Sequence, residues 1–226
     1  MPIYLLTDKL NFPPVEGAED GIVAIGGDLS PERLLLAYQK GIFPWYSEEE
    51  PIIWHSPEDR FVLLPDELHI SKSMQRVLNS DRFKVTFDTD FSFIIHQCAV
   101  TDRKEQDGTW ITGEMIKAYT ELYYLGFAHS VEVWQDEKIV GGVYGVSIGK
   151  CFFAESMFHT VSNASKFALI KLVDLLKKYD FLFLDAQVFT EHVATLGAKE
   201  IPRNEFIRLL NEGLKQDSLT CKWTNL

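Results

Sequence analysis

The stretch from Cys151 to Phe189, CFFAESMFHTVSNASKFALIKLVDLLKKYDFLFLDAQVF, decides the fold. Six of its first eight residues are apolar or aromatic, which predicts a strand over Cys151–Phe158. From Ser162 or Asn163 to about Tyr179 the apolar residues recur at helical spacing, which predicts a long amphipathic helix. The continuous apolar run from Phe181 to Val188 then predicts a strand buried on both faces. A strand, a helix and a second strand in this order are typical of an α/β fold.

Upstream of this stretch, Ala128–Trp134 and Ile139–Ile148 read as two strands joined by a turn at 135–138. Downstream, helices are expected around 190–196 and 203–214. Neighbouring strands joined by short turns are antiparallel, whereas a strand–helix–strand unit brings its two strands parallel. We therefore predict the α/β class with a mixed sheet.

The first sixty residues differ from the rest. Ser30 and Pro31 begin a helix that Gly41 ends, and an aromatic, proline-containing stretch at 41–46 is expected to be a packed loop. Prolines at 44, 51 and 57 precede a strand that begins at Arg60. We predict a small N-terminal α/β domain over 1–60 and a larger domain over 61–226. In the larger domain, further helices are expected after Ser71, from Asp90 to about Val100 and at 113–125, with a strand at 83–87.

Composition narrows the class of protein. The chain has 226 residues, a formal net charge of −11 and three cysteines without a C-x-x-C pair. No apolar run is long enough to span a membrane, and the histidines show no metal-ligand spacing, so we expect a cytoplasmic protein without a metal. The acidic balance argues against a general nucleic-acid binder. One basic stretch, 71–84, carries Lys72 and Arg76 on one helix face, and this face is either solvated or a phosphate contact.

The glycine-rich segment Gly145-Val146-Ser147-Ile148-Gly149 matches the G-x-S-x-G motif of serine hydrolases. That motif requires a strand, a sharp turn and then a helix, but another strand is expected after Gly149. We therefore interpret the segment as part of a hairpin. Its glycines, with Gly141 and Gly142, indicate bulges and close backbone approaches.

Polar residues interrupt the buried strands at two places. Asp185 and Gln187 lie two apart in the run 181–189, so on a strand they share a face. Glu155 lies in mid-strand among aromatic residues, on the face expected for Phe153 and Met157. Buried carboxylates need partners, so these residues form either structural pairs or a shared cleft.

The sequence resembles a known family, the bacterial leucyl/phenylalanyl-tRNA–protein transferases. The resemblance is carried by blocks in the same order along the chain, among them Gly26–Pro31, Ala37–Trp45, Gly108–Thr112, Gly141–Val146, Glu155–Phe158, Asn163–Lys166, Asp185–Val188 and Leu196–Arg203. It implies transfer of leucine or phenylalanine, with methionine as a third candidate, from aminoacyl-tRNA to an N-terminal Arg or Lys of a protein, which creates a degradation signal. It also implies a GNAT-like acyltransferase fold in the larger domain and no cofactor.

The resemblance also implies roles for individual residues. Trp45 and Trp110 would stack around the terminal adenosine, and Asp185 and Gln187 would lie at the reacting centre in a catalytic or orienting role. Glu155 would hold a cation of one of the substrates. The remaining candidates for substrate binding are Phe152, Met157, Leu169, Leu172 and Leu176, which form an apolar pocket or ordinary core. Relatives carry Met at the position of Val143 and Phe at those of Leu172 and Leu176, so the pocket should differ in volume.

Lys72 and Arg76 become candidates for the acceptor stem of the tRNA. We expect a monomer with no membrane partner. Two other functions remain open. A coenzyme A-dependent acetyltransferase of the same fold would need a glycine-containing pyrophosphate loop before the long helix, and 159–165 contains no glycine. A non-catalytic adaptor for basic N-termini would bind peptides without needing Asp185 and Gln187.

Overall fold

The computed structural model describes residues 4–101 and 110–226, so Gly108 and Thr109 of the quoted blocks lie outside the described residues. Its N-terminal part contains a four-stranded sheet in the order β1-β2-β4-β3. The strands are β1 (Tyr4–Leu6), β2 (Ile22–Gly26), β3 (Phe43–Pro44) and β4 (Ile53–His55), with a short 3-10 helix η1 (Val15–Gly17) and helix α1 (Pro31–Gln39) between them. The stretch expected as a packed loop therefore includes the short strand β3.

The larger sheet has seven strands in the order β11-β5-β10-β9-β8-β7-β6. Their bounds are β5 (Asp59–Leu63), β6 (Lys84–Phe87), β7 (Ala128–Gln135), β8 (Lys138–Ile148), β9 (Cys151–His159), β10 (Phe183–Asp185) and β11 (Lys199–Pro202). β10 runs parallel to β9, and the other neighbouring pairs are antiparallel. The predicted α/β fold with a mixed sheet is confirmed.

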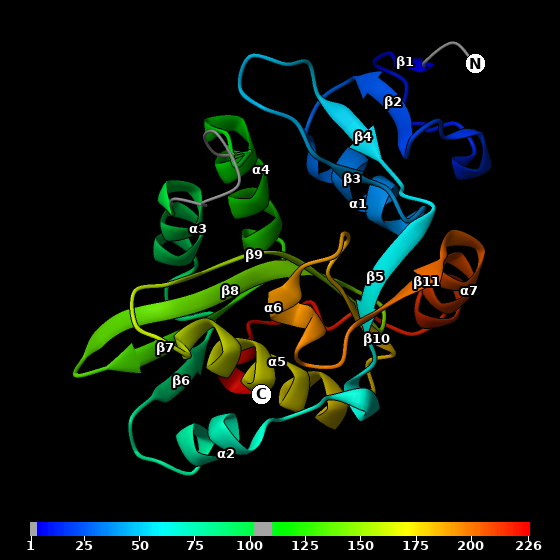
Figure 1. Cartoon of the computed structure of the whole chain (residues 1–226). Helices are drawn as coiled ribbons and strands as arrows, with labels where there is room; N and C mark the ends of the chain where they lie inside the picture. The colour runs from blue at the N-terminus through cyan, green and yellow to red at the C-terminus, as the bar shows by residue number, and fades with distance from the viewer. Residues whose placement is uncertain (1–3, 102–109) are drawn as a thin grey trace.

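Helices cover both faces of this sheet (Figure 1). One face carries α3 (Phe91–Val100) and α4 (Gly113–Tyr124), and the other carries α5 (Ala164–Lys178) with α2 (Lys72–Leu78) beside it. The short helix α6 (Glu191–Ala194) and α7 (Arg203–Gly213) follow β10 and β11, and 3-10 helices η2 (Pro65–Glu67) and η3 (Trp223–Asn225) complete the chain. None of the helices in the described part of the chain is both long and apolar enough to cross a membrane.

The helix signals in the sequence act as expected at most termini. Ser71, Asp90 and Thr112 each accept a hydrogen bond from a backbone N–H of the first turn of their helix. Ser30 does not, although it lies at the N-cap of α1; its backbone N–H instead donates to Asp28. The glycine after α1, Gly41, has φ +73°, a conformation that other residues adopt with strain.

The predicted hairpin is confirmed, and its glycines allow the close approaches that we expected. Ser147 is buried within β8, and Gly149 makes the turn into β9 with φ +57°. A Cβ atom on Gly145 would lie 2.2 Å from the carbonyl oxygen of Phe153 on the neighbouring strand. The segment therefore does not present Ser147 as a nucleophile.

The last buried strand is shorter than predicted. β10 ends at Asp185, because Gln187 adopts φ +59° and leaves the strand direction. Its backbone remains tied to β5, since Ala186 N–H donates to the carbonyl of Phe61 and Phe61 N–H donates to that of Gln187. Gln187 therefore lies outside the strand, and the prediction that its side chain shares a strand face with that of Asp185 is wrong.

The two sheets share one hydrophobic core. Leu34 and Tyr38 of α1 belong to the same buried cluster as Phe153 of β9 and Phe206 of α7, and the rings of Tyr38 and Phe153 lie 4.9 Å apart. The first sheet ends with β4 and the second begins with β5. A domain boundary near residue 60 stays a prediction.

Candidate active site

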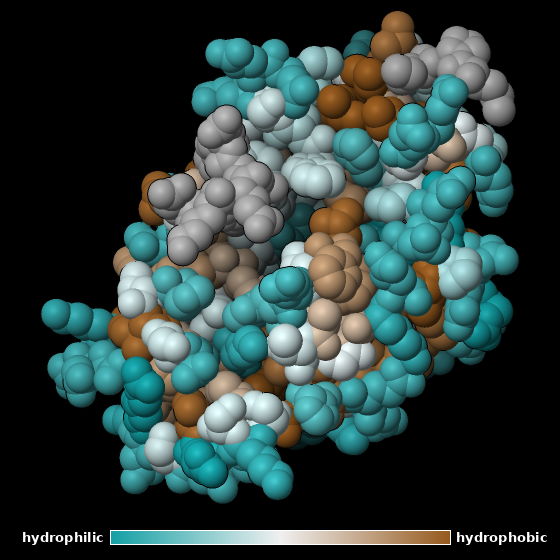
Figure 2. Space-filling model, viewed as in Figure 1, coloured by the Kyte–Doolittle hydropathy of each residue, from teal (hydrophilic) through white to brown (hydrophobic). Residues whose placement is uncertain are grey.

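A pocket of about 230 Å³ opens where the N-terminal part meets the larger sheet. Its walls come from β3, β9, α5 and the segment between β10 and α6. On the face drawn in Figure 2, hydrophobic residues are exposed in the middle of the molecule, below the N-terminal part. The described lining residues are Phe43, Pro44, Trp45, Trp110, Ala154, Glu155, Ser156, Met157, Leu169, Leu184, Ala186, Gln187, Val188, Thr190 and Val193.

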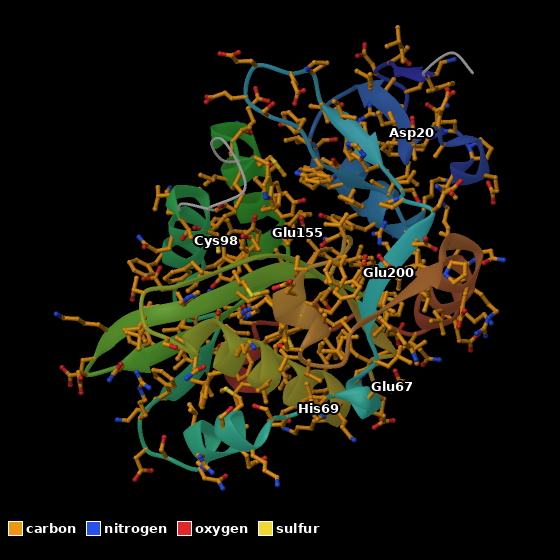
Figure 3. The ribbon with its side chains drawn as sticks, viewed as in Figure 1. Asp20, Glu67, His69, Cys98, Glu155 and Glu200 are labelled. Atoms are coloured by element: carbon orange, nitrogen blue, oxygen red, sulfur yellow. The ribbon has the colours of Figure 1, made fainter. Side chains whose placement is uncertain are left out.

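Glu155 is the only titratable side chain among these described lining residues. It enters the pocket through a β-bulge, because Tyr144 pairs with Ser156 and Gly145 pairs with Ala154, leaving Glu155 without a partner on β8. A bulge bends its strand and re-aims side chains. Consecutive residues from Ala154 to Met157 therefore line the pocket, whereas strict alternation would have removed every second one. Figure 3 shows Glu155 near the centre of the molecule, away from Glu67 and His69 in its lower part.

The carboxylate of Glu155 is held by two neutral donors. Gln187 Nε2 donates to Oε1 over 2.9 Å, and the hydroxyl of Tyr119 donates to Oε2 over 3.0 Å. Each carboxylate oxygen can accept a further hydrogen bond, so capacity remains for a substrate group. Burial raises the pKa of Glu155 to about 7, against the opposing effect of the tyrosine hydrogen bonds. The group therefore changes its charge near neutral pH.

The tyrosine that holds Glu155 is itself held by a second one. The hydroxyls of Tyr38 and Tyr119 lie 2.5 Å apart, and because Tyr119 donates to Glu155, Tyr38 donates to Tyr119. Burial raises the pKa of both phenols well above their usual range, so both remain protonated donors. The pair links α1 and α4 to the floor of the pocket.

Asp185 lies behind the pocket and not in its lining. It is fully buried, and Arg60, 1% exposed, binds it with three hydrogen bonds of 2.6 to 3.0 Å. Its Oδ1 also accepts the backbone N–H of Gln187 over 2.9 Å. Asp185 therefore fixes the turn that carries Gln187, and the side chain of Gln187 fixes Glu155.

The structure brings together six of the residues predicted for the site. Trp45, Trp110, Glu155, Met157, Leu169 and Gln187 line one pocket, and the side chain of Trp45 is 37% exposed. Phe152, Leu172 and Leu176 do not belong to this lining. They lie in the buried cluster beneath the sheet, where the ring of Phe152 lies 5.7 Å from that of Trp223. On α5 it is Leu169 that reaches the pocket. Leu169 lies one turn before Leu172 and two turns before Leu176.

Lys72 and Arg76 are both exposed on α2, whereas Met74 of the same helix is buried. α2 packs beside α5 and lies at the opposite side of the molecule from β3 (Figure 1). Within the described residues, no group of three His, Cys, Asp or Glu side chains could hold a metal ion.

Sequence reasoning missed three residues of the site: Arg60, Tyr38 and Tyr119. In the sequence Arg60 stands out only as the first residue of a predicted strand, and no local signal connects it with Asp185, 125 positions away. Tyr38 lies within the helix that the sequence predicts between Pro31 and Gly41. Its hydroxyl has no sequence signal that distinguishes it from ordinary packing.

Most of the chain is similar to one protein family. The family model described as leucyl/phenylalanyl-tRNA protein transferase matches residues 62–211, and the model of the N-terminal domain of that transferase matches 27–58. Relatives named leucyl/phenylalanyl-tRNA–protein transferase include one from Syntrophus aciditrophicus, 54% identical over 99% of this chain and 94% of its own, and one from Thermodesulfovibrio yellowstonii, 52% identical over 99% and 91%. Among solved structures, L-PGS from Bacillus licheniformis has a TM-score of 0.39 and 13% identity over 72% of this chain and 55% of its own.

Proposed function

Because this chain belongs to the leucyl/phenylalanyl-tRNA–protein transferase family and is an aminoacyltransferase, we propose that it uses N-terminal arginine and lysine as acceptors. The transferred residue is leucine or phenylalanine, with methionine as a third candidate. The carrying observation is a pocket with two tryptophans, an apolar wall and a single described titratable group, Glu155. We also propose that the protein is cytoplasmic and acts as a monomer. For a monomer, sedimentation equilibrium should give a mass of 25.9 kDa, that of one chain.

The reaction is aminolysis of an activated ester, so it needs positioning more than a strong catalyst. The acceptor's α-amino nitrogen attacks the ester carbonyl, the new C–N bond forms, and the bond to the ribose oxygen breaks. The amine loses a proton and the ribose oxygen gains one. An α-amino group has a reference pKa of about 7.7–8.0, so a useful fraction of it is neutral near pH 7.

In this proposal Trp45 and Trp110, which both line the pocket, stack on the terminal adenine, because base–aromatic contacts need only a flat accessible ring and read no sequence. The apolar lining residues Met157, Leu169 and Val193 receive the transferred side chain in this proposal. Glu155 in its charged form attracts a cation, either the ammonium of the transferred residue or the basic group of the acceptor.

Of the two roles considered for Asp185, catalytic or orienting, its geometry favours orientation. Both of its oxygens are occupied by Arg60, and it reaches the pocket only through Gln187. In the proposal, Asp185 and Gln187 keep Glu155 and the reacting ester in register.

One assay distinguishes this function from its rivals. The protein is mixed with radiolabelled leucyl-tRNA and a peptide that begins with arginine, without coenzyme A. We expect label in the peptide, and no label when the arginine is N-acetylated. A parallel reaction supplies acetyl-coenzyme A in place of leucyl-tRNA. Transfer only in that reaction would favour an acetyltransferase, and peptide binding without transfer in either reaction would favour an adaptor. Either result would reject the proposal.

A further inference from the structure

We infer that Arg60 is a positioning residue for the transfer reaction, an inference that rests on the proposed function. It fixes the position of the wall that carries Trp45, made of Phe43, Pro44 and Trp45, relative to the floor of the pocket, made of Glu155 and Gln187. Arg60 does not touch the pocket, and no motif pointed to it. Its contacts with both sides of the site carry the inference.

The first set of contacts leads to the floor. Arg60 Nε donates to both oxygens of Asp185, over 2.9 and 3.0 Å, and its Nη2 donates to Oδ2 over 2.6 Å. Asp185 then accepts the backbone N–H of Gln187, whose amide group binds Glu155. Gln187 stands at φ +59°, a conformation that a non-glycine residue keeps only when its surroundings fix it. Arg60 and Asp185 supply that constraint.

The second set of contacts leads to the wall. Arg60 Nη1 donates to the carbonyl of Gly41 over 3.0 Å. Gly41 begins the short segment that continues into Phe43, Pro44 and Trp45. These three residues form the wall, whereas Gly41 does not line the pocket. The guanidinium also lies over the ring of Phe43, with its central carbon 4.7 Å from the ring centre. One side chain thus contacts both halves of the site.

The planar, five-donor shape of the guanidinium matters to this role. It reaches a carboxylate through two of its nitrogens and a carbonyl through the third, while its face rests on aromatic rings, including Phe206 at 4.5 Å. A lysine ammonium is a single point of charge on a flexible stem. It cannot make these contacts together.

A purely structural role would give a different result in mutants. Replacing a buried ion pair by apolar residues often preserves stability, whereas removing one partner does not. We therefore compare R60M, which leaves Asp185 buried without its cation, with R60M/D185L, which removes both charges. R60K serves as a milder variant that keeps the charge.

Arg33 provides a matched control. It is equally buried, pairs with Asp28 at 3.1 Å and donates to the backbone carbonyls of Thr7 and Lys9, outside the described lining of the pocket. R33M and R33K should lower the melting temperature without lowering transfer in the folded protein.

The experiment measures thermal unfolding, single-turnover transfer from leucyl-tRNA to an Arg-initiated peptide, and binding of an aminoacyl-adenosine analogue with an amide in place of the ester. R60M should lose both stability and transfer. R60M/D185L should regain most of the melting temperature, yet transfer should stay lower by about 10²-fold and the analogue should bind more weakly, as expected for a small misplacement. R60K should lower the single-turnover rate at saturating peptide and weaken analogue binding, while the peptide concentration that gives half of this rate stays unchanged.

Transfer at the wild-type rate by a folded R60K or R60M/D185L would overturn the inference alone. Absence of transfer by the unchanged protein would overturn the proposed function, and the inference with it. If R60M/D185L does not fold, R60K and its control R33K decide the question.

Discussion

Glu155 illustrates how a single residue's chemistry depends on its surroundings. A glutamate in water is charged at pH 7, but burial raises the pKa of Glu155 to about 7. Its charge is nevertheless retained in part, because Gln187 and Tyr119 donate to both of its oxygens. Glu155 can therefore bind a cation when it is deprotonated, and it loses this attraction when it gains a proton as the pH falls.

The first prediction concerns the pH dependence of transfer. If charged Glu155 holds a cation, the single-turnover rate of the wild-type protein should fall as the pH decreases through about 7. E155Q should transfer slowly and lack this acidic limb, leaving only the titration of the amine nucleophile. Rates measured from pH 5.5 to 8.5 with both proteins test it: below about pH 7 the rate should fall more steeply with decreasing pH in the wild-type protein than in E155Q, where only the amine titrates, and equally steep falls would reject the role of Glu155.

The same residue predicts a pH dependence of stability. Because the folded-state pKa lies above the ordinary value of 4.5, the contribution of Glu155 is most favourable below about pH 4.5 and is lost as the pH rises through about 7. One pKa unit corresponds to about 1.4 kcal/mol, so the loss is of the order of 3 kcal/mol. Urea unfolding should show the wild-type protein losing this amount relative to E155Q between pH 5 and 8, and parallel curves would contradict it.

A further prediction concerns the exposed tryptophan of the wall. W45A removes a stacking surface worth about 1–3 kcal/mol, so the Kd for the aminoacyl-adenosine analogue should rise by about 5- to 150-fold. Y124A removes an aromatic ring that is more exposed, from α4 outside the described lining, and should leave the Kd unchanged. Equal effects of the two substitutions would show that Trp45 does not stack on the ligand.

Irregularities in two strands, β9 and β10, position Glu155 and Gln187. The bulge in β9 turns Glu155 toward the pocket, and the early end of β10 frees Gln187 to reach it. Both irregularities lie where a regular strand would have directed the side chains elsewhere. The helix α2, in contrast, is regular and presents Lys72 and Arg76 side by side on its surface.

We predict that G145A disturbs the bulge. Its Cβ would lie 2.2 Å from the carbonyl oxygen of Phe153, so β8 and β9 must separate, at a cost of about 1–3 kcal/mol. We expect a lower melting temperature and slower transfer in calorimetry and single-turnover assays. G113A is the matched control, since a Cβ there meets nothing within 4 Å. Unchanged transfer in a destabilised G145A would show that the bulge does not aim Glu155.

For α2, we predict an effect on the salt dependence of tRNA binding. If Lys72 and Arg76 contact phosphates, K72A/R76A should make the log–log slope of affinity against salt shallower by about 1.5. R208A/K215A removes two charges from exposed residues at α7 and just after it, and should leave the slope unchanged. Filter binding of leucyl-tRNA at several salt concentrations measures both, and identical slopes would remove α2 from the tRNA interface.

At the scale of the whole molecule, charge is unevenly distributed along the chain. The net charge is −11, and residues 1–60 contain 4 basic and 11 acidic side chains. A protein that holds only the end of a tRNA makes few phosphate contacts. Its pocket can also attract a cationic acceptor terminus. Net acidity is therefore compatible with a tRNA substrate of this kind.

This distribution predicts a shallow salt dependence overall. For the wild-type protein and intact leucyl-tRNA, the log–log slope should be about −2 to −4. The same titration that tests α2 provides this value. A slope near −8 would indicate an extensive phosphate interface and would contradict the interpretation of the charge pattern.

Local signals in the sequence determined most of the elements. Helix periodicity and caps such as Asp90 and Thr112 act over three or four residues, so α3, α4 and α5 were predictable within a few positions. The order of strands and helices sufficed for the α/β class with a mixed sheet, and motifs read as a set sufficed for the family. Asp185, Gln187 and Glu155 stood out because charged or polar groups within apolar strands are costly.

Only the tertiary structure decided how these residues act. The partner of Asp185 is 125 positions away, and no local pattern specifies contacts over that distance. The bulge at Glu155 depends on the register between β8 and β9, which alternation alone does not reveal. Leu169 lines the pocket while Leu172 and Leu176 fill the core, because helical spacing defines an apolar face but not what that face meets. The sequence by itself therefore determined which groups must be accommodated, and packing between distant segments determined which of them face the pocket.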